Sequence, residues 1–212
     1  MTELSRPVPF RGGGFVAAPR PWAGWIVLVA VLGLWQGAAS AGRIDTLFFP
    51  APYDVGKALW RLVASGQMGA HVFASMKRLL AGLALGASLG VMVGVAAGLL
   101  TSARMVAAPI VAALFPIPKI ALLPLFILWF GIGEPSKVAT IAFGAFFPMV
   151  IATMGGVDAV DRGLIRMAQS FGAPPGDIVR KVALPAAAPA ILSGLRIAAS
   201  IGIVLIVAAE MI

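Results

Sequence analysis

The chain lacks cysteine and has few charged residues. Its 212 residues include no Cys and a single His, so the sequence holds no disulfide framework and no thiolate metal site. Asp, Glu, Lys and Arg together make up 11% of the chain, against about 25% in an average soluble domain. Because a soluble protein needs charge to cover its surface, this scarcity argues against an ordinary globular domain.

Acidic residues are scarcer still. There are 8 Asp and Glu against 16 Lys and Arg, which gives a formal net charge of +8. The basic residues are scattered, without a basic stripe or interleaved aromatic residues, so we predict no nucleic-acid partner. Most acidic residues, Glu134 among them, fall in expected loops, and only Glu210 lies deep in an expected terminal span.

Motifs for catalysis are also missing. The sequence has no GxxxxGK[ST] segment for binding ATP, no serine nucleophile motif and no series of buried carboxylates for a proton relay. His71 has no His or Cys partner at ligand spacing. We therefore predict that the chain is not an enzyme itself and that it holds no metal and no cofactor.

What the chain has in abundance is apolar residues, which make up 60% of it, with a mean hydropathy of +1.01. A surplus of this size cannot be hidden in one soluble core, so lipid must surround much of the surface. We predict an all-α, polytopic transmembrane helical bundle in a bacterial inner membrane. Five apolar segments have the length of spans: residues 22–40, 79–100, 105–130, 138–156 and 191–212.

The N-terminal third divides into three predicted parts. Residues 1–21 are expected to form a disordered cytoplasmic tail and residues 22–41 the first transmembrane helix. Residues 42–70 are expected to be an extracytoplasmic segment, whose helix carries apolar residues on one face and lies at the membrane surface. A basic head, an apolar stretch and Ala39-Ser40-Ala41 also fit a cleaved signal peptide, and this alternative stays open.

The second span contains a row of glycines at every fourth position. A row of this kind forms a slowly winding ridge without side chains, along which another helix can approach closely. Glycine is also simply common in spanning helices, but five in one register favour close packing. The row consists of Gly82, Gly86, Gly90, Gly94 and Gly98.

The third span follows an expected turn at residues 101–104 and is interrupted by prolines. Proline removes a backbone donor, and in lipid that loss is tolerated where protein or a water-filled cavity repairs it. We expect this stretch to line a translocation path, while a merely kinked structural helix remains an equal alternative. The candidate lining residues are Pro116, Pro118, Lys119 and Pro124.

The polar loop over residues 158–190 has the most specific pattern. It predicts a helix, a turn at Gly172, a second helix that begins near Pro175, and a stop at Pro185. An apolar face on such a loop has no lipid to lie in and indicates a surface for a partner protein. The residues expected on that face are Met167, Ala168, Phe171, Ile178, Val179 and Val182.

This loop resembles the signature loop of the permease subunits of type I ABC importers. The signature reads E-A-A, three residues, G, nine residues, I, any residue, L-P. Arg166 stands where the signature has a Glu, which reverses a charge. The matching positions here are Ala168, Gly172, Val182, Leu184 and Pro185. In that family the loop is the coupling helix that docks on the ATP-hydrolysing subunit, and the resemblance implies the same role here.

Further stretches resemble the nitrate, sulfonate and taurine branch of that family. They are Ser75 to Arg78 with Gly82, Pro118 to Leu125, Trp129 to Gly133, Phe146 to Pro148, and Leu184-Pro185 through Gly194 to Arg196 and Glu210. The resemblance implies a permease domain over residues 71–212, two ATP-binding subunits, a second permease copy and an extracytoplasmic solute-binding protein. The family has six spans and five are predicted here, so a truncated, non-transporting remnant or scaffold is the alternative expectation. A secondary transporter ranks third, because no buried carboxylate or inverted repeat supports it.

Overall fold

The computed structural model describes residues 21–211, and all regular structure in this range is helical. The predicted all-α fold is therefore confirmed. The predicted tail, residues 1–21, lies outside the described residues except for Pro21. The chain divides into two units, residues 21–69 and residues 70–211, and each is described by itself.

The first unit is a pair of helices, α1 (Pro21–Ser40) and α2 (Pro52–Ala64). α1 is apolar on all sides and long enough to cross a membrane. α2 begins with a proline in its first turn, where the missing N–H costs nothing, and Asp54 favours the helix N-terminus. The backbone N–H of Tyr53 donates to the Gln36 side chain at 3.0 Å, which ties the start of α2 to α1.

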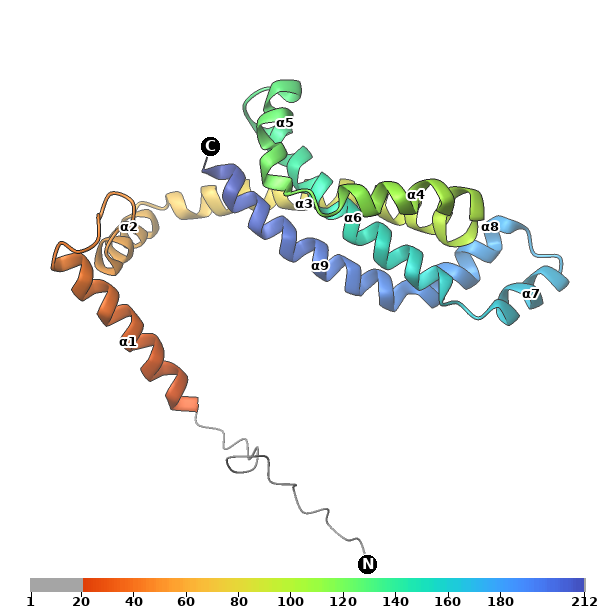
Figure 1. Cartoon of the computed structure of the whole chain (residues 1–212), viewed down its shortest axis with the longest axis horizontal. Coiled ribbons are helices and arrows are strands. Elements are labelled where there is room, and N and C mark those ends of the chain that lie inside the picture. The colour runs from red at the N-terminus through yellow and green to blue at the C-terminus, as the bar shows by residue number, and fades with distance from the viewer. Residues whose placement is uncertain (1–20, 212) are drawn as a thin grey trace, which may run out of the picture. The chain divides into compact units, whose positions relative to one another are not determined.

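The second unit contains the remaining helices, with η1 a 3-10 helix and η2 a π-helix. Figure 1 labels the α-helices among them. They are α3 (Gln67–Leu99, which starts in the first unit), α4 (Thr101–Leu114), η1 (Lys119–Leu122), α5 (Leu123–Phe130), α6 (Glu134–Asp158), α7 (Arg162–Ser170), α8 (Pro175–Ile178), η2 (Val179–Ala183) and α9 (Leu184–Glu210).

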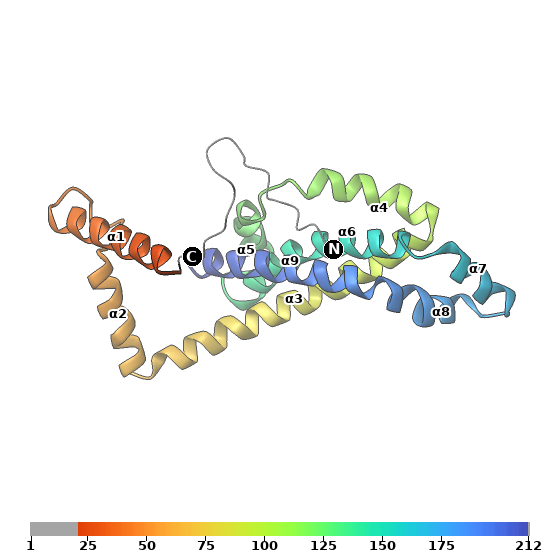
Figure 2. The same cartoon turned by 90° about the horizontal axis from the view of Figure 1, so that it is seen from below.

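Three long helices, α3, α6 and α9, form the core of the second unit and lie side by side in Figures 1 and 2. Leu79 of α3, Ile141 of α6 and Leu205 of α9 meet in one buried cluster. α4 packs on another side of α6, where Val111 meets Phe147 and other apolar residues. We call α3, α6 and α9 the three-helix bundle.

The predicted number of five spans is reached when one bent pair of helices is counted as a span. Among the described residues, four helices are long and apolar enough to cross a membrane, and a bent pair makes up to five. The bent pair joins α4 to η1 and α5 at an angle of 93°. Pro116 and Pro118 lie at the bend, where they cannot supply the backbone donors that a continuous helix requires.

Two predicted boundaries were wrong. Residues 101–104 are the first turn of α4 and not a turn between helices. One extended residue, Leu100, is enough to end α3 and begin α4. Pro185 does not stop the second helix of the loop. It lies in the first turn of α9, where its missing N–H does no damage, and the π-helix η2 carries the chain from α8 into α9 without a break. Residues 175–190 of the predicted loop are therefore helical.

Candidate functional site

The helix α7 is fixed at both of its ends by local hydrogen bonds. At its start the Asp161 carboxylate accepts from the backbone N–H of Gly163 at 2.7 Å. At its end Gly172 has a φ of +73°, and its N–H donates to the Gln169 carbonyl at 2.9 Å. The N–H of Ala173 donates to the Ala168 carbonyl at 3.1 Å, which completes a Schellman motif. Glycine is required at this position because other residues strain in the left-handed conformation.

α7 has two chemically different faces. One face is apolar and exposed, with Leu164 44%, Met167 54% and Phe171 83% accessible. The other face carries two arginines and a glutamine beside one isoleucine, and it lines a cavity. The residues of that face are Arg162, Ile165, Arg166 and Gln169. Arg166, which reverses a charge of the signature loop, thus lies on the cavity side, away from the exposed apolar residues.

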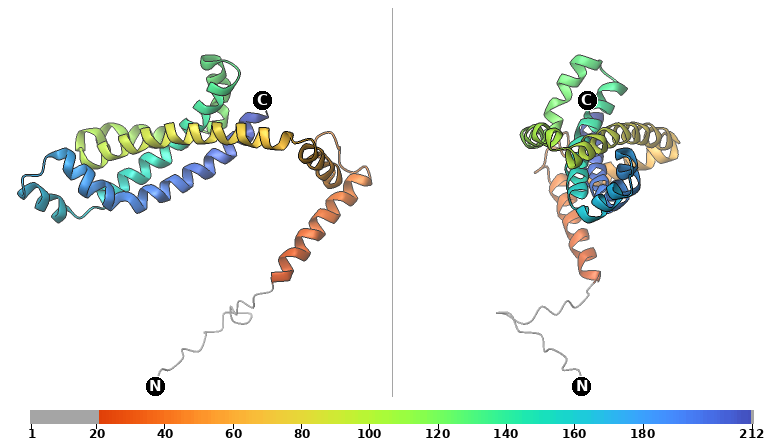
Figure 3. Two further views of the ribbon diagram at one scale, coloured as in Figure 1. Left: turned by 180° about the vertical axis from the view of Figure 1, so that it is seen from behind. Right: turned by 90° about the vertical axis from the view of Figure 1, so that its right-hand side faces the viewer.

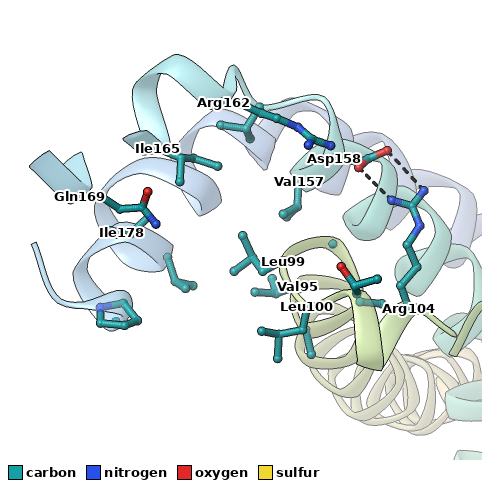
Figure 4. Close-up of a pocket in the computed structure, with 18 of the residues that line it drawn as sticks. Val95, Leu99, Leu100, Arg104, Val157, Asp158, Arg162, Ile165, Gln169 and Ile178 are labelled. Carbon is teal, nitrogen blue, oxygen red and sulfur yellow. Dashed lines mark hydrogen bonds and ion pairs between the residues drawn. The ribbon is translucent and has the colours of Figure 1, made fainter. Parts of the chain in front are cut away.

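The cavity has a volume of about 820 Å³ and lies where α7 and α8 meet the ends of α3, α4 and α6. Figure 4 shows Ile165 and Gln169 of α7 on one side and Val95 and Leu99 of α3 on the other. At the rim, Arg104 of α4 pairs with Asp158 of α6 through contacts of 2.8 and 3.3 Å. Figure 3 shows α7 and α8 beyond the end of the three-helix bundle.

The other predicted loop residues are divided between α7 and the start of α9. Ala168 is half-buried on the helix. Val182 and Leu184 are half-buried where η2 passes into α9, and Pro185 beside them is exposed. The structure thus places Arg166, Ala168 and Gly172 on α7 and its turn, and the remaining three at the base of α9. Of the predicted apolar face, Ile178 is buried in the chain itself.

The row of glycines on α3 lies directly against α6. A Cβ at Gly82 would lie 2.6 Å from the Ile141 side chain, and one at Gly90 would lie 2.5 Å from Met149. Gly86 faces the Ala142 backbone in the same way. α9 also approaches α6 closely, since a Cβ at Gly156 would lie 2.7 Å from the Ala190 side chain. All these contacts leave no room for larger residues.

The prolines of the broken span surround a lysine without an acidic partner among residues 21–211. Lys119 donates to the Phe115 carbonyl, and its ammonium lies 4.7 Å from the Phe115 ring and 5.4 Å from the Phe147 ring. Aromatic faces attract a cation electrostatically, which compensates part of its lost hydration. Pro116, Pro118 and Pro124 are exposed in this chain, and Lys119 is half-buried.

An ion cluster ties the three long helices together at one end, and the sequence analysis missed it. The Arg78 side chain of α3 donates to Glu134 at the start of α6, with one contact of 2.7 Å, and to Glu210 at the end of α9 at 2.6 Å. The Ser75 hydroxyl donates to Glu210 at 2.7 and 2.8 Å. We call these four residues the outer cluster.

The sequence held only part of the information needed to find the outer cluster. Ser75 and Arg78 are three residues apart, so they share a face of a helix. Glu210 stood out as an acidic residue in an apolar span. Their partner Glu134 was assigned to a loop, whereas it is the first residue of α6. Because the pairing joins residues up to 135 positions apart, no local pattern predicts it.

Comparison with known proteins gives consistent matches over most of the chain. The family model described as binding-protein-dependent transport system inner membrane component matches residues 86–212. A putative aliphatic sulfonates transport permease of Escherichia coli (strain K12) is 40% identical over 190 residues, which cover 90% of this chain and 72% of that protein. A taurine transport system permease of the same strain is 38% identical and covers 87% and 69%.

A more distant relative is named for another solute. A riboflavin transport system permease of Chloroflexus aurantiacus is 36% identical over 171 residues, which cover 81% of this chain and 64% of that protein. The matches and the several apolar helices agree in placing the chain in an inner membrane with multiple passes. The chain belongs to the family of binding-protein-dependent transport system inner membrane components, as an ABC importer permease of the sulfonate and taurine branch.

Proposed function

We propose that the chain forms the membrane path for a small solute of the sulfonate type, with ATP hydrolysed by a separate subunit. The names of its relatives support this solute class, since two of those described above are named for aliphatic sulfonates and for taurine. In this proposal the chain contributes a helix packing with two access states, and the ATP-binding subunit decides which state is favoured.

The observation that carries the proposal is the exposed apolar face of α7. Leu164, Met167 and Phe171 lie on a short helix whose two ends are fixed by hydrogen bonds. A preformed apolar surface of this kind loses little conformational entropy on binding, so it suits a docking surface. We infer that the ATP-binding subunit covers this face and transmits its movement through α8 and η2 to α9.

The proposed assembly contains two copies of this chain, two ATP-binding subunits and one extracytoplasmic solute-binding protein. The solute-binding protein would deliver the solute at the membrane face opposite α7. The solute would then cross between the two permease copies. The family membership supports an ATP-binding partner and a solute-binding protein, and the copy numbers are part of the proposal.

The test is co-purification in detergent of the chain with the ATP-binding subunit encoded beside it. Phe171→Asp places a charge on the apolar face of α7, and we expect at least a tenfold loss of bound partner because the charge would have to be desolvated. Phe48→Asp is the matched control, since Phe48 is 80% exposed against 83% for Phe171 but lies in the first unit. Arg166→Glu should keep the partner, because Arg166 lines the cavity.

The outcome that contradicts the proposal is equal retention of the partner by the Phe171→Asp and unmodified chains. If Phe171→Asp and Phe48→Asp lose the partner to the same extent while both remain folded, the loss is not specific to α7 and the assigned docking surface is wrong. Thermal unfolding of each variant in detergent shows whether such damage is present.

A further inference from the structure

Charges of opposite sign occupy different positions along the axis of the three-helix bundle. We call a position along this axis a level. The acidic residues of the three-helix bundle lie at helix ends: Glu134 is the first residue of α6, Asp158 its last, and Glu210 the last of α9. Two basic residues, Lys119 and Arg196, lie between these ends. The middle level of this unit is therefore positive in the part of the chain that the structure describes.

The level of Arg196 follows from the packing of α9 on α6. The two helices are antiparallel, since Gly194 meets Ala152 whereas Gly156 meets Ala190. Arg196 consequently lies level with the part of α6 near residue 150, close to the midpoint of that helix. The Lys119 ammonium lies 5.4 Å from the ring of Phe147, and Phe147 precedes residue 150 by less than one helical turn. The short helix η1, which begins with Lys119, also contacts α9.

Arg196 points away from the bundle. The buried residues of α9 include Gly194, Ala198 and Gly202, which lie on the side facing α3 and α6. Arg196 is exposed on the opposite side, together with Ser193 and Ser200 at helical spacing. Within residues 21–211, no acidic side chain pairs with Arg196.

A charge in this position is costly unless water or an anion meets it. Arg196 is 12 residues from Leu184 at the start of α9 and 14 residues from Glu210 at its end, which at 1.5 Å per residue is about 18 and 21 Å. An arginine side chain cannot extend that far to reach the membrane surface. Charged residues inside a span therefore face a water-filled cavity, a partner or a transport path. The same face also carries the exposed apolar residues Leu192, Ile203 and Val207, so the charge of Arg196 is the feature of this face that requires water, a partner or an anion.

The geometry points to an anion-binding site on this face of α9, at mid-depth in the path of the transported solute. The inference rests on the proposed function and adds the charge of the solute to it. The guanidinium group of Arg196 offers two parallel donors, which fit two oxygen atoms of a sulfonate or carboxylate. Lys119 adds a second positive charge at the same level. Arg196 is the binding residue.

The absence of cysteine makes a direct test possible, because an introduced thiol is unique on the chain. Ser200→Cys puts a thiol one turn from Arg196. In membranes that hold the assembled transporter, its rates of modification by an anionic sulfonatoethyl and a cationic trimethylammonium-ethyl methanethiosulfonate are compared by gel shift. Each rate is divided by that of free 2-mercaptoethanol. We expect the anionic reagent to be favoured, and Arg196→Gln to lower this preference about tenfold.

Two further variants make the result decisive. Arg196→Lys keeps the charge and should keep the preference for the anionic reagent, whereas a purely structural role of Arg196 predicts the same loss as for Arg196→Gln. Ala198→Cys is fully buried against α6 and should react with neither reagent. The proposal is overturned if Ser200→Cys reacts with neither reagent, or if Arg196→Gln leaves the preference unchanged. Loss of the ATP-binding subunit with an intact preference would instead contradict only the coupling role of α7.

Discussion

The two ends of the three-helix bundle are held in different ways. At the end where α6 begins, Arg78 joins Glu134 and Glu210, so one side chain ties all three helices, and it is 19% exposed. At the end where α6 finishes, Asp158 pairs only with Arg104 of α4, and the two side chains are 39% and 46% exposed. We call the first the closed end and the second the open end.

The difference indicates which end of the three-helix bundle changes first when α7 is displaced. A network in which one arginine is shared by two carboxylates resists separation more than a single ion pair does, even though Glu134 is 61% and Glu210 30% exposed. The open end also borders the cavity of about 820 Å³ beneath α7, so α7 and α8 have space to shift. We expect a force applied at α7 to change the open end first, while the closed end keeps α3, α6 and α9 together.

The largest effect is expected from disrupting the packing of α3 on α6, which runs between the closed end and the open end. Gly86 of α3 faces the backbone of Ala142, which cannot rotate away as a side chain can. Gly86→Leu should therefore push α3 away from α6 at a cost of about 3 kcal/mol. The expected result is a severalfold loss of monodisperse protein in detergent, measured by size-exclusion chromatography.

Gly69→Leu is the control for this substitution. Gly69 lies on the same helix, and a Cβ there would meet nothing within 4 Å. The control should keep the yield of the unmodified chain, because leucine is also the better helix former. Equal yields of the two variants would show that α3 and α6 do not pack closely along the glycine row.

A smaller but clear effect is expected at the closed end. Arg78→Gln removes the charge that holds Glu134 and Glu210 together and leaves two carboxylates near each other. Both contacts of Arg78 are charge-assisted hydrogen bonds, but water screens the one to Glu134, which is 61% exposed. The Tm in detergent should therefore fall by a few degrees. Adding Glu134→Gln should restore part of the loss, because it relieves the repulsion. An additive, further loss in the double variant would contradict the shared cluster.

The sequence predicted the helical fold, the number of spans and the turn at Gly172, because each depends on local pattern. Hydropathy marks a span, and a glycine followed by two prolines marks the end of a helix. The sequence did not reveal which helix the glycine row meets, since a bare ridge fits any close partner. The outer cluster was also missed, because Arg78 and Glu210 come together only after the helices have packed. The stop at Pro185 was wrongly predicted, because a proline ends one helix and begins another equally well.

The smallest effect is expected at the open end, and it decides whether the two ends really differ. Arg104→Gln leaves Asp158 without its ion-pair partner, but the carboxylate remains hydrated at 39% exposure. Exposed ion pairs of this kind contribute little to stability because water screens them, so the Tm should change by no more than about 2 °C, and less still at high salt. Arg78→Gln measured beside it is the reference. If Arg104→Gln lowers the Tm as much as Arg78→Gln does, both ends are held equally firmly. Movement of α7 would then have to be absorbed by bending at the π-helix η2, just before α9, since neither end of the bundle could open.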